Sequence, residues 1–205
     1  MKQLSLKKIL VNMTFKEKCN YILYYYKVHI IICLLSIIFI GIFVYGQSTK
    51  KDVYINITYI GNYFSEDLSS DICDTLNSDL IPDDKSKTVV FDMLDTSNTQ
   101  NLIKLQASFA ASDIDFAIIN EDFFNENYPN ELFEDLNSID GFSSLNFNPN
   151  SLLKKNEVVY GININYLNTF NKINYNTDTD NFLVLISNSK NTDKFIKLLS
   201  YYNIS

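Results

Sequence analysis

Arginine and tryptophan are absent from the sequence, and histidine occurs once, as His29. Because there is no guanidinium group, bidentate recognition of phosphates or of base edges by arginine is excluded. The single imidazole precedes the long apolar run described below, so the residues beyond that run have no Ser–His or Cys–His pair. Of the 3 cysteines, only Cys73 lies beyond residue 46, which excludes a disulfide within the C-terminal region. That region must therefore be stabilised by a hydrophobic core.

Charge is divided unevenly along the 205 residues, whose formal net charge is −7. Residues 1–46 contain 6 lysines and 1 acid, a net charge of +5, whereas residues 47–205 contain 11 lysines and 23 acids, a net charge of −12. A region this acidic repels phosphate groups, so nucleic acid is not expected as a partner. The length suits one ordinary domain with a short appendage.

Residues 30–46 (IIICLLSIIFIGIFVYG) form a long apolar run of 17 residues without a charge, which Val28 and His29 extend to 19. As a helix this run measures about 25–29 Å, close to the hydrocarbon thickness of a bilayer. We therefore predict a single transmembrane helix over residues 28–46. Six lysines precede the run and only Lys50 and Lys51 follow it closely, which favours a cytoplasmic N-terminus and an extracellular C-terminal domain.

A cleavable signal peptide is the alternative interpretation of this run. Val44 and Gly46 are small enough for the −3 and −1 positions of a cleavage site. However, the run is longer than the usual apolar region of a signal peptide, and the preceding 27 residues are long for its basic region. We therefore expect the run to remain in the protein as a membrane anchor.

The chain then divides into three segments. These are a basic cytoplasmic segment (1–27), the transmembrane helix (28–46) and an extracellular domain (47–205). In the first segment, Thr14 and Glu17 have capping-box spacing and predict a juxtamembrane helix that begins directly after Thr14. The lipid bilayer is the expected partner of the first two segments.

Short β-rich runs alternate with helical patterns in the extracellular domain. Strands are predicted from β-branched and aromatic runs, and helices from apolar residues at helical spacing between capping residues and prolines. The predicted strands are residues 53–60, 88–94, 114–119, 158–164 and 182–187, and the predicted helices are residues 66–80, a helix opening at Asn98 or Thr99, 121–127 and 192–202. This alternation is typical of an α/β fold, and we predict a mostly parallel sheet with helices on both faces.

Several stretches resemble known families. Residues 14–35 (TFKEKCNYILYYYKVHIIICLL) resemble the N-terminal anchor of uncharacterised single-span membrane proteins of clostridia and bacilli. Residues 113–138, 158–164 (VVYGINI) and 183–202 are similar to one lobe of an extracellular solute-binding protein of the ABC-transporter type. The resemblance implies a single solute-binding-protein-like lobe. A complete protein of that family closes two lobes on its ligand, and residues 141–157 are too short to be a second lobe.

Candidate binding residues follow from the expected sheet, because ligands of open parallel sheets bind beyond the carboxyl ends of the strands. The candidate ligand-binding residues are Asn62, Tyr63, Asn98, Asn120, Glu121 and Asp122. Tyr63 and the adjacent Phe64 fit either an exposed contact or packing under the first helix. No catalytic residue, metal ligand or cofactor is predicted. Residues 176–181 (NTDTDN) place side-chain oxygens at alternate positions, as a calcium-binding loop does, but the required glycine and bidentate glutamate are missing.

Three functions remain open at this point. We expect a non-enzymatic, membrane-anchored extracellular binding or interaction module, such as an accessory to a transporter or an envelope sensor. The alternative is a solute receptor that gains its second wall by dimerising, and a more distant alternative is an extracellular hydrolase. The expected partners besides lipid are another membrane protein, a transporter or a second copy of the chain.

Overall fold

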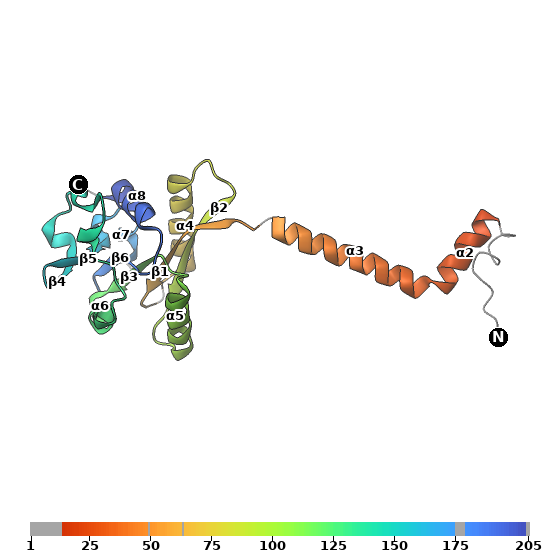
Figure 1. Cartoon of the computed structure of the whole chain (residues 1–205), viewed down its shortest axis with the longest axis horizontal. Helices are drawn as coiled ribbons and strands as arrows, with labels where there is room; N and C mark the ends of the chain where they lie inside the picture. The colour runs from red at the N-terminus through yellow and green to blue at the C-terminus, as the bar shows by residue number, and fades with distance from the viewer. Residues whose placement is uncertain (1–13, 49, 63, 175–178, 204–205) are drawn as a thin grey trace. The chain divides into compact units, whose positions relative to one another are not determined.

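The computed structural model describes residues 14–48, 50–62, 64–174 and 179–203. It divides into two compact units, Met1–Lys50 and Lys51–Ser205, and each is described by itself (Figure 1). The described residues of the first unit form two helices, and those of the second form a single sheet with its helices.

Helices α2 (Phe15–Tyr25) and α3 (Lys27–Ser48) make up the described part of the first unit. The Glu17 carboxylate accepts hydrogen bonds from the Thr14 amide at 2.8 Å and the Thr14 hydroxyl at 2.9 Å, so the predicted capping box is present. Helix α3 is long and apolar enough to cross a membrane, by length and composition, over Lys27–Gly46. A signal sequence near an N-terminus has the same length and composition.

Six strands form the sheet of the second unit, in the order β2–β1–β3–β6–β5–β4. The strands are β1 (Asp52–Ile60), β2 (Lys87–Leu94), β3 (Phe116–Asn120), β4 (Leu152–Lys155), β5 (Val158–Asn163) and β6 (Asn181–Leu185). Strand β1 pairs in parallel with β2 and β3, but β6 is antiparallel to β3 and to β5, and β4 is antiparallel to β5. The sheet is therefore mixed, and the prediction of a mostly parallel sheet is wrong.

The connections explain why half of the sheet is antiparallel. Only Asn156 and Glu157 join β4 to β5, and both have left-handed backbone, with φ of 51° and 68°. A connection of two residues permits only an antiparallel hairpin. At the next step, Asn163 at the end of β5 pairs with Phe182 at the start of β6. The chain that leaves the sheet at the end of β5 therefore re-enters it at the same end, and β6 runs antiparallel to β5.

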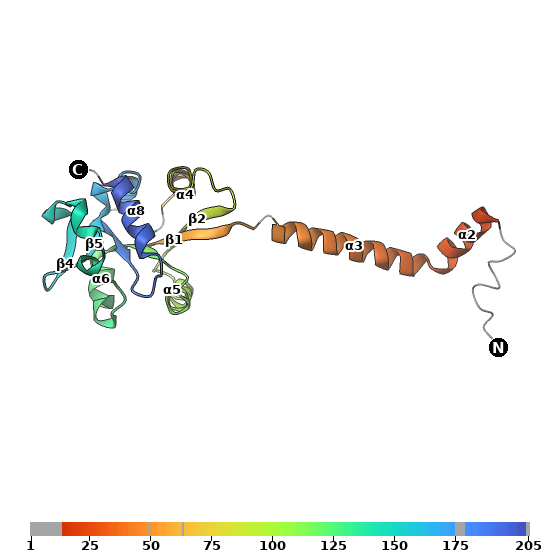
Figure 2. The same ribbon diagram turned by 45° about the horizontal axis from the view of Figure 1, so that its top comes forward.

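Helices cover both faces of the sheet, as predicted (Figures 1 and 2). Helices α4 (Glu66–Leu80) and α8 (Thr192–Tyr202) pack on one face, and α5 (Thr99–Ala111) and α6 (Glu121–Asn127) pack on the other. The remaining elements are α7 (Asn171–Asn174) and the short 3₁₀ turns η1 (Tyr128–Asn130), η2 (Leu136–Ser138), η3 (Phe142–Leu145), η4 (Pro149–Ser151) and η5 (Ile164–Tyr166).

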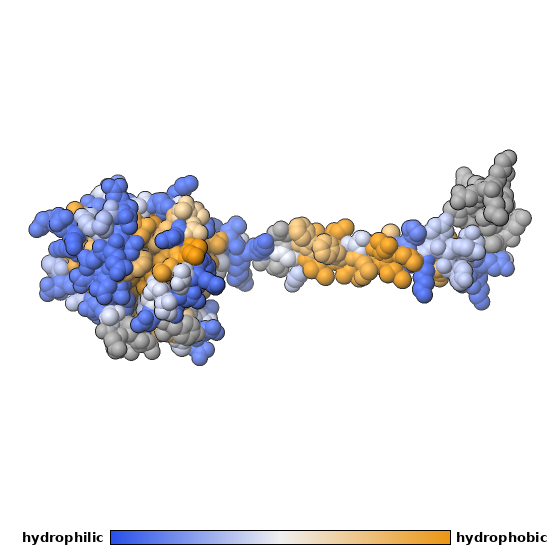
Figure 3. Space-filling view, turned by 90° about the horizontal axis from the view of Figure 1, so that it is seen from below, coloured by the Kyte–Doolittle hydropathy of each residue, from blue (hydrophilic) through white to orange (hydrophobic). Residues whose placement is uncertain are grey.

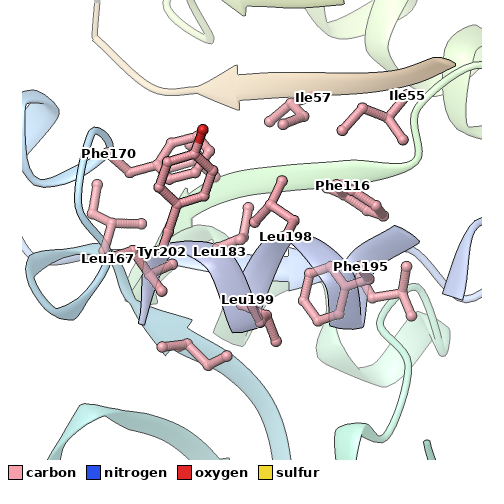
Figure 4. Packing of buried hydrophobic residues seen from close by; sticks show 14 of the residues in the cluster. Ile55, Ile57, Phe116, Leu167, Phe170, Leu183, Phe195, Leu198, Leu199 and Tyr202 are labelled. Carbon is pink, nitrogen blue, oxygen red and sulfur yellow. The ribbon is translucent and has the colours of Figure 1, made fainter. Parts of the chain in front are cut away.

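The larger core lies between the sheet and helix α8 (Figure 4). Phe195 of α8 meets Phe116 of β3 with ring centroids 5.0 Å apart, and Leu198 and Leu199 are fully buried beside them. At the end of the helix, the Tyr202 hydroxyl donates a 2.8 Å hydrogen bond to the Asp79 carboxylate of α4. The two helices of this face are thus joined by both apolar packing and a polar contact.

Asp115 joins several elements at the end of the sheet where β3 begins. Its carboxylate accepts hydrogen bonds from the Asn56 amide at 2.9 Å, the Ser189 hydroxyl at 2.9 Å and the Asn191 side-chain amide at 2.7 Å. These donors belong to β1 and to the turn that leads from β6 into α8. One partly buried carboxylate therefore fixes the start of β3 to strands and turns far away in the sequence.

Candidate functional site

A groove of about 440 Å³ lies between α5 and α6, where the helices follow the carboxyl ends of β2 and β3. We call it the α5–α6 groove. Its lining residues are Leu102, Leu105, Gln106 and Phe109 of α5, Asp122, Phe123, Glu126 and Asn127 of α6, and Thr96 and Asn120 from the loop after β2 and the end of β3. The position agrees with the rule that open α/β sheets bind ligands beyond the carboxyl ends of their parallel strands.

The floor of the groove is apolar. Leu105 is 3% exposed and belongs to the second hydrophobic core, against which Phe109 and Phe123 are partly buried. On the outer surface of α5, Leu102 is 38% exposed and Ile103 is 63% exposed. Figure 3 shows this side of the domain, with apolar surface in a strip between hydrophilic ridges. A groove with this lining can hold apolar side chains of a ligand.

The rim of the groove on α6 is acidic. Asp122 and Glu126 are four residues apart, so they project from the same side of the helix, and both are exposed. The ion pair found among the described residues joins Asp84 to Lys87 at 2.9 Å, so within that part of the chain neither rim carboxylate has a cationic partner within 4.0 Å. These charges favour a ligand that is basic as well as apolar.

Two of the predicted site residues line the groove, Asn120 and Asp122. Asn120 also caps α6, because its side-chain oxygen accepts a 2.8 Å hydrogen bond from the Phe123 amide. Asn98 caps α5 in the same way, with the Gln100 amide at 2.9 Å. The side-chain oxygens of both asparagines are therefore engaged in starting helices.

The other predicted site residues do not line the groove. Asn62 and Glu121 are exposed, and Tyr63 lies outside the described residues. Phe64 is 4% exposed, with its ring 4.9 Å from that of Tyr59, so of the two interpretations of Phe64 the core packing is correct.

Groove residues that the sequence analysis missed include Leu102, Phe123 and Glu126. Helical spacing places Leu102 on the same apolar face as Leu105 and Phe109, but in the structure it is only partly covered. The available signal was the apolar pattern of α5, which also includes Ile103 and is wider than one packed face requires.

Groups for covalent chemistry are few in the second unit. Burial, and then the charge of Asp74, raises the pKa of the Cys73 thiol, which donates a hydrogen bond to the Val89 carbonyl at 3.3 Å. A thiol of raised pKa is a poor nucleophile, because the thiolate is the reactive form. Among the described residues, no group of three or more His, Cys, Asp or Glu side chains is arranged to hold a metal ion. The first three residues of the calcium-like run at residues 176–181 lie outside the described residues.

Comparison with known proteins gives distant structural likenesses. No family model and no curated protein matches the sequence. Among solved structures, the chain is similar to an extracellular solute-binding protein family 1 from Alicyclobacillus acidocaldarius, with a TM-score of 0.39 and 11% sequence identity. The match covers 56% of this chain and 28% of that protein, so the chain spans less than a third of its neighbour's length. The neighbour is of the class that the sequence resembles, and no functional argument rests on so distant a likeness.

Proposed function

We propose that the chain is a membrane-anchored extracellular binding module, and that the α5–α6 groove docks an apolar, lysine- or arginine-bearing helix of another envelope protein. The observation that carries the proposal is the pairing, in one groove, of an apolar floor with two rim carboxylates that have no cationic partner among the described residues. Apolar burial supplies affinity to such an interface, and complementary charge sets the orientation of the partner.

The choice of a basic occupant rests on charge complementarity. Residues 47–205 carry a net charge of −12, and the groove adds Asp122 and Glu126 at its rim. A basic helix is attracted by this field before contact is made, whereas an acidic helix is repelled. Its apolar side chains then cover Leu102, which lines the groove and is otherwise partly exposed to water.

In this proposal helix α3 is an uncleaved single span in the cell membrane. Its support is the excess of lysines before the apolar run and their scarcity after it, which favours a cytoplasmic N-terminus. The C-terminal domain then lies outside the cell, where an accessory to a transporter or an envelope sensor meets its partner.

The proposed module is not an enzyme and needs no metal or cofactor. Residues 47–205 contain neither histidine nor arginine, and the Cys73 thiol in that region is held in its unreactive form. Binding is proposed to involve the end of the sheet that also carries Asn62, Asn98 and Glu121. Nucleic acid is not a proposed partner.

The test uses the full chain in phosphatidylcholine nanodiscs and a leucine–lysine repeat peptide as the probe. Calorimetry should show saturable binding of this peptide after the heat measured with empty nanodiscs is subtracted. A leucine–glutamate repeat peptide, used as the acidic control, should not bind. The double variant Asp122→Asn/Glu126→Gln should weaken binding about tenfold, equivalent to about 1.4 kcal/mol. The matched control Asp71→Asn/Asp74→Asn removes two exposed charges from α4, on the other face of the sheet, and should leave the affinity unchanged.

Three results would contradict the proposal. Equal loss of affinity in both double variants would mean that the peptide responds only to net charge. Equal binding of the acidic peptide would mean that the rim carboxylates are irrelevant. Tight binding of a free solute by a dimer, with no peptide affinity, would replace the module with the receptor completed by a second copy.

A further inference from the structure

A second cavity, of about 540 Å³, lies away from the α5–α6 groove, beside the turn η1 and strand β5. We call it the tyrosine cleft. Its lining includes the aromatic side chains Tyr128, Phe133 and Tyr160 and the carboxylates of Glu131, Glu134 and Asp135. None of these residues lines the α5–α6 groove, so the tyrosine cleft is independent of the function proposed above.

The aromatic wall of the cleft is held rigidly. The rings of Tyr128 and Tyr160 meet edge to face, with centroids 5.4 Å apart and an interplanar angle of 79°. Both rings also contact Phe124, at 5.6 and 5.4 Å, and Phe124 is only 1% exposed. Because α6 and β5 fix these side chains from two directions, the ring faces are ordered before any ligand arrives.

The acidic residues of the cleft have no compensating cation among the described residues. Glu131, Glu134 and Asp135 occur within five consecutive residues and line the same cleft. Within the described ranges, none of the three carboxylates lies within 4.0 Å of a lysine or histidine nitrogen, since the ion pair found there is Asp84–Lys87. Burial, and then the neighbouring Tyr128, raises the pKa of the Tyr160 hydroxyl, and the charge of Asp135 acts in the same direction.

One cation of the chain already uses this aromatic cluster. The Lys155 ammonium lies 5.9 Å from the centroid of the Tyr128 ring and is held by a 3.0 Å hydrogen bond to the Asn125 side-chain oxygen. Lys155 is not one of the lining residues of the cleft. The ammonium group is therefore within cation–π range of the ring without lining the cleft. Of the three acidic residues of the cleft, Asp135 also accepts a 2.8 Å hydrogen bond from the Asn137 amide.

We propose that the tyrosine cleft binds a small organic ammonium ion. Aromatic faces attract weakly hydrated cations, and the three carboxylates neutralise the charge of such an ion as it leaves water. The methyl or methylene groups of the ligand contact Tyr128, Tyr160 and Phe133, and its positive charge faces Glu131, Glu134 and Asp135. The negative charge of the lining repels an anion and does not attract a neutral molecule.

Tetramethylammonium is the probe for this proposal, and calorimetry of the full chain in maltoside micelles is the measurement. Maltoside carries no choline headgroup that would compete for the cleft. We expect saturable binding of tetramethylammonium, and about tenfold weaker binding of neopentyl alcohol, which has a similar shape and no charge. Potassium chloride at the same ionic strength should not displace the ion, because potassium keeps its hydration more strongly.

Variants locate the site and separate it from a general attraction to an acidic surface. Glu131→Gln/Glu134→Gln should weaken binding about tenfold. Tyr160→Leu should have a similar effect, and Tyr160→Phe, which keeps the ring in its packed position, should retain binding. The control Asp71→Asn/Asp74→Asn removes two charges from α4 and should leave the affinity for tetramethylammonium unchanged.

The proposal fails if tetramethylammonium shows no saturable binding, or if neopentyl alcohol binds equally well. It also fails if the α4 control weakens binding as much as the cleft variants do. The leucine–lysine peptide takes no part in this experiment, so failure here leaves the α5–α6 groove proposal standing, and failure of the peptide test leaves this one standing.

Discussion

Replacing Asp115 tests the polar junction between β1, β3 and the turn that leads into α8. The variant Asp115→Ala removes an acceptor that three donors share, the Asn56 amide and the side chains of Ser189 and Asn191. Hydrogen bonds to a charged acceptor contribute about 1.5–3 kcal/mol each, but these groups are only partly buried and water replaces part of each bond. We therefore expect a loss of about 2–3 kcal/mol in the free energy of unfolding.

Asp113 provides the matched control for this prediction. It is a nearby exposed aspartate whose backbone carbonyl, not its side chain, accepts the 2.6 Å hydrogen bond from the Asn56 side chain. Asp113→Ala keeps that carbonyl and should change stability by less than about 0.5 kcal/mol. The assay is thermal unfolding of the full chain in maltoside micelles, followed by circular dichroism.

The size of the expected shift follows from the size of the unit. In a domain of about 150–250 residues, each kcal/mol changes Tm by about 2–4 °C, so Asp115→Ala should lower Tm by about 4–12 °C. Equal melting of Asp115→Ala and Asp113→Ala would refute the reasoning, because the three hydrogen bonds would then contribute nothing that water cannot replace.

Three further predictions concern the core, alkaline stability and topology. Leu105→Asp should destabilise the domain by about 3–5 kcal/mol in urea titrations, because an unpaired carboxylate would enter the core, whereas Leu102→Asp on the more exposed side should cost less than about 1 kcal/mol. Burial, and then Asp79, raises the pKa of the Tyr202 hydroxyl. Above about pH 10 the unfolded state therefore loses the hydroxyl proton first, and the free energy of unfolding should fall as the pH rises. The variant Tyr202→Phe, which has no hydroxyl, should flatten that dependence. Protease added to intact protoplasts should remove the C-terminal domain and spare a tag at Met1, and a protected C-terminus would contradict the orientation.

Local elements of the second unit were predictable because their signals are local. Helix α4 begins after Ser65, whose hydroxyl oxygen accepts a hydrogen bond from the Leu68 amide at 3.4 Å. The helix ends at Leu80, two residues before Pro82. The capping residue and the proline therefore predict its two ends. Strand direction has no comparable signal, because the side chains of a buried strand are apolar whether its neighbours are parallel or antiparallel. The Asn156–Glu157 turn decides the direction of β4, and neither this strand nor its turn was predicted, since the turn lacks the usual glycine.

The candidate site was predictable only in position. The polar residues at the ends of strands were found in the sequence, but the side-chain oxygens of Asn98 and Asn120 serve as helix caps. The α5–α6 groove itself depends on how far Phe109 and Phe123 stand apart when two helices pack on one sheet face. Sequence spacing within one helix carries no information on that distance between two helices.

Hydrogen exchange of the full chain in nanodiscs, with and without the leucine–lysine peptide, tests most directly whether the α5–α6 groove is the docking surface. The proposed docking predicts slower exchange of backbone amides in residues 99–111 and 121–127 when the peptide is bound, and unchanged exchange in residues 66–80 of α4 on the other face of the sheet. Protection confined to α4 or α8, or saturating peptide with no protection in α5 and α6, would contradict it.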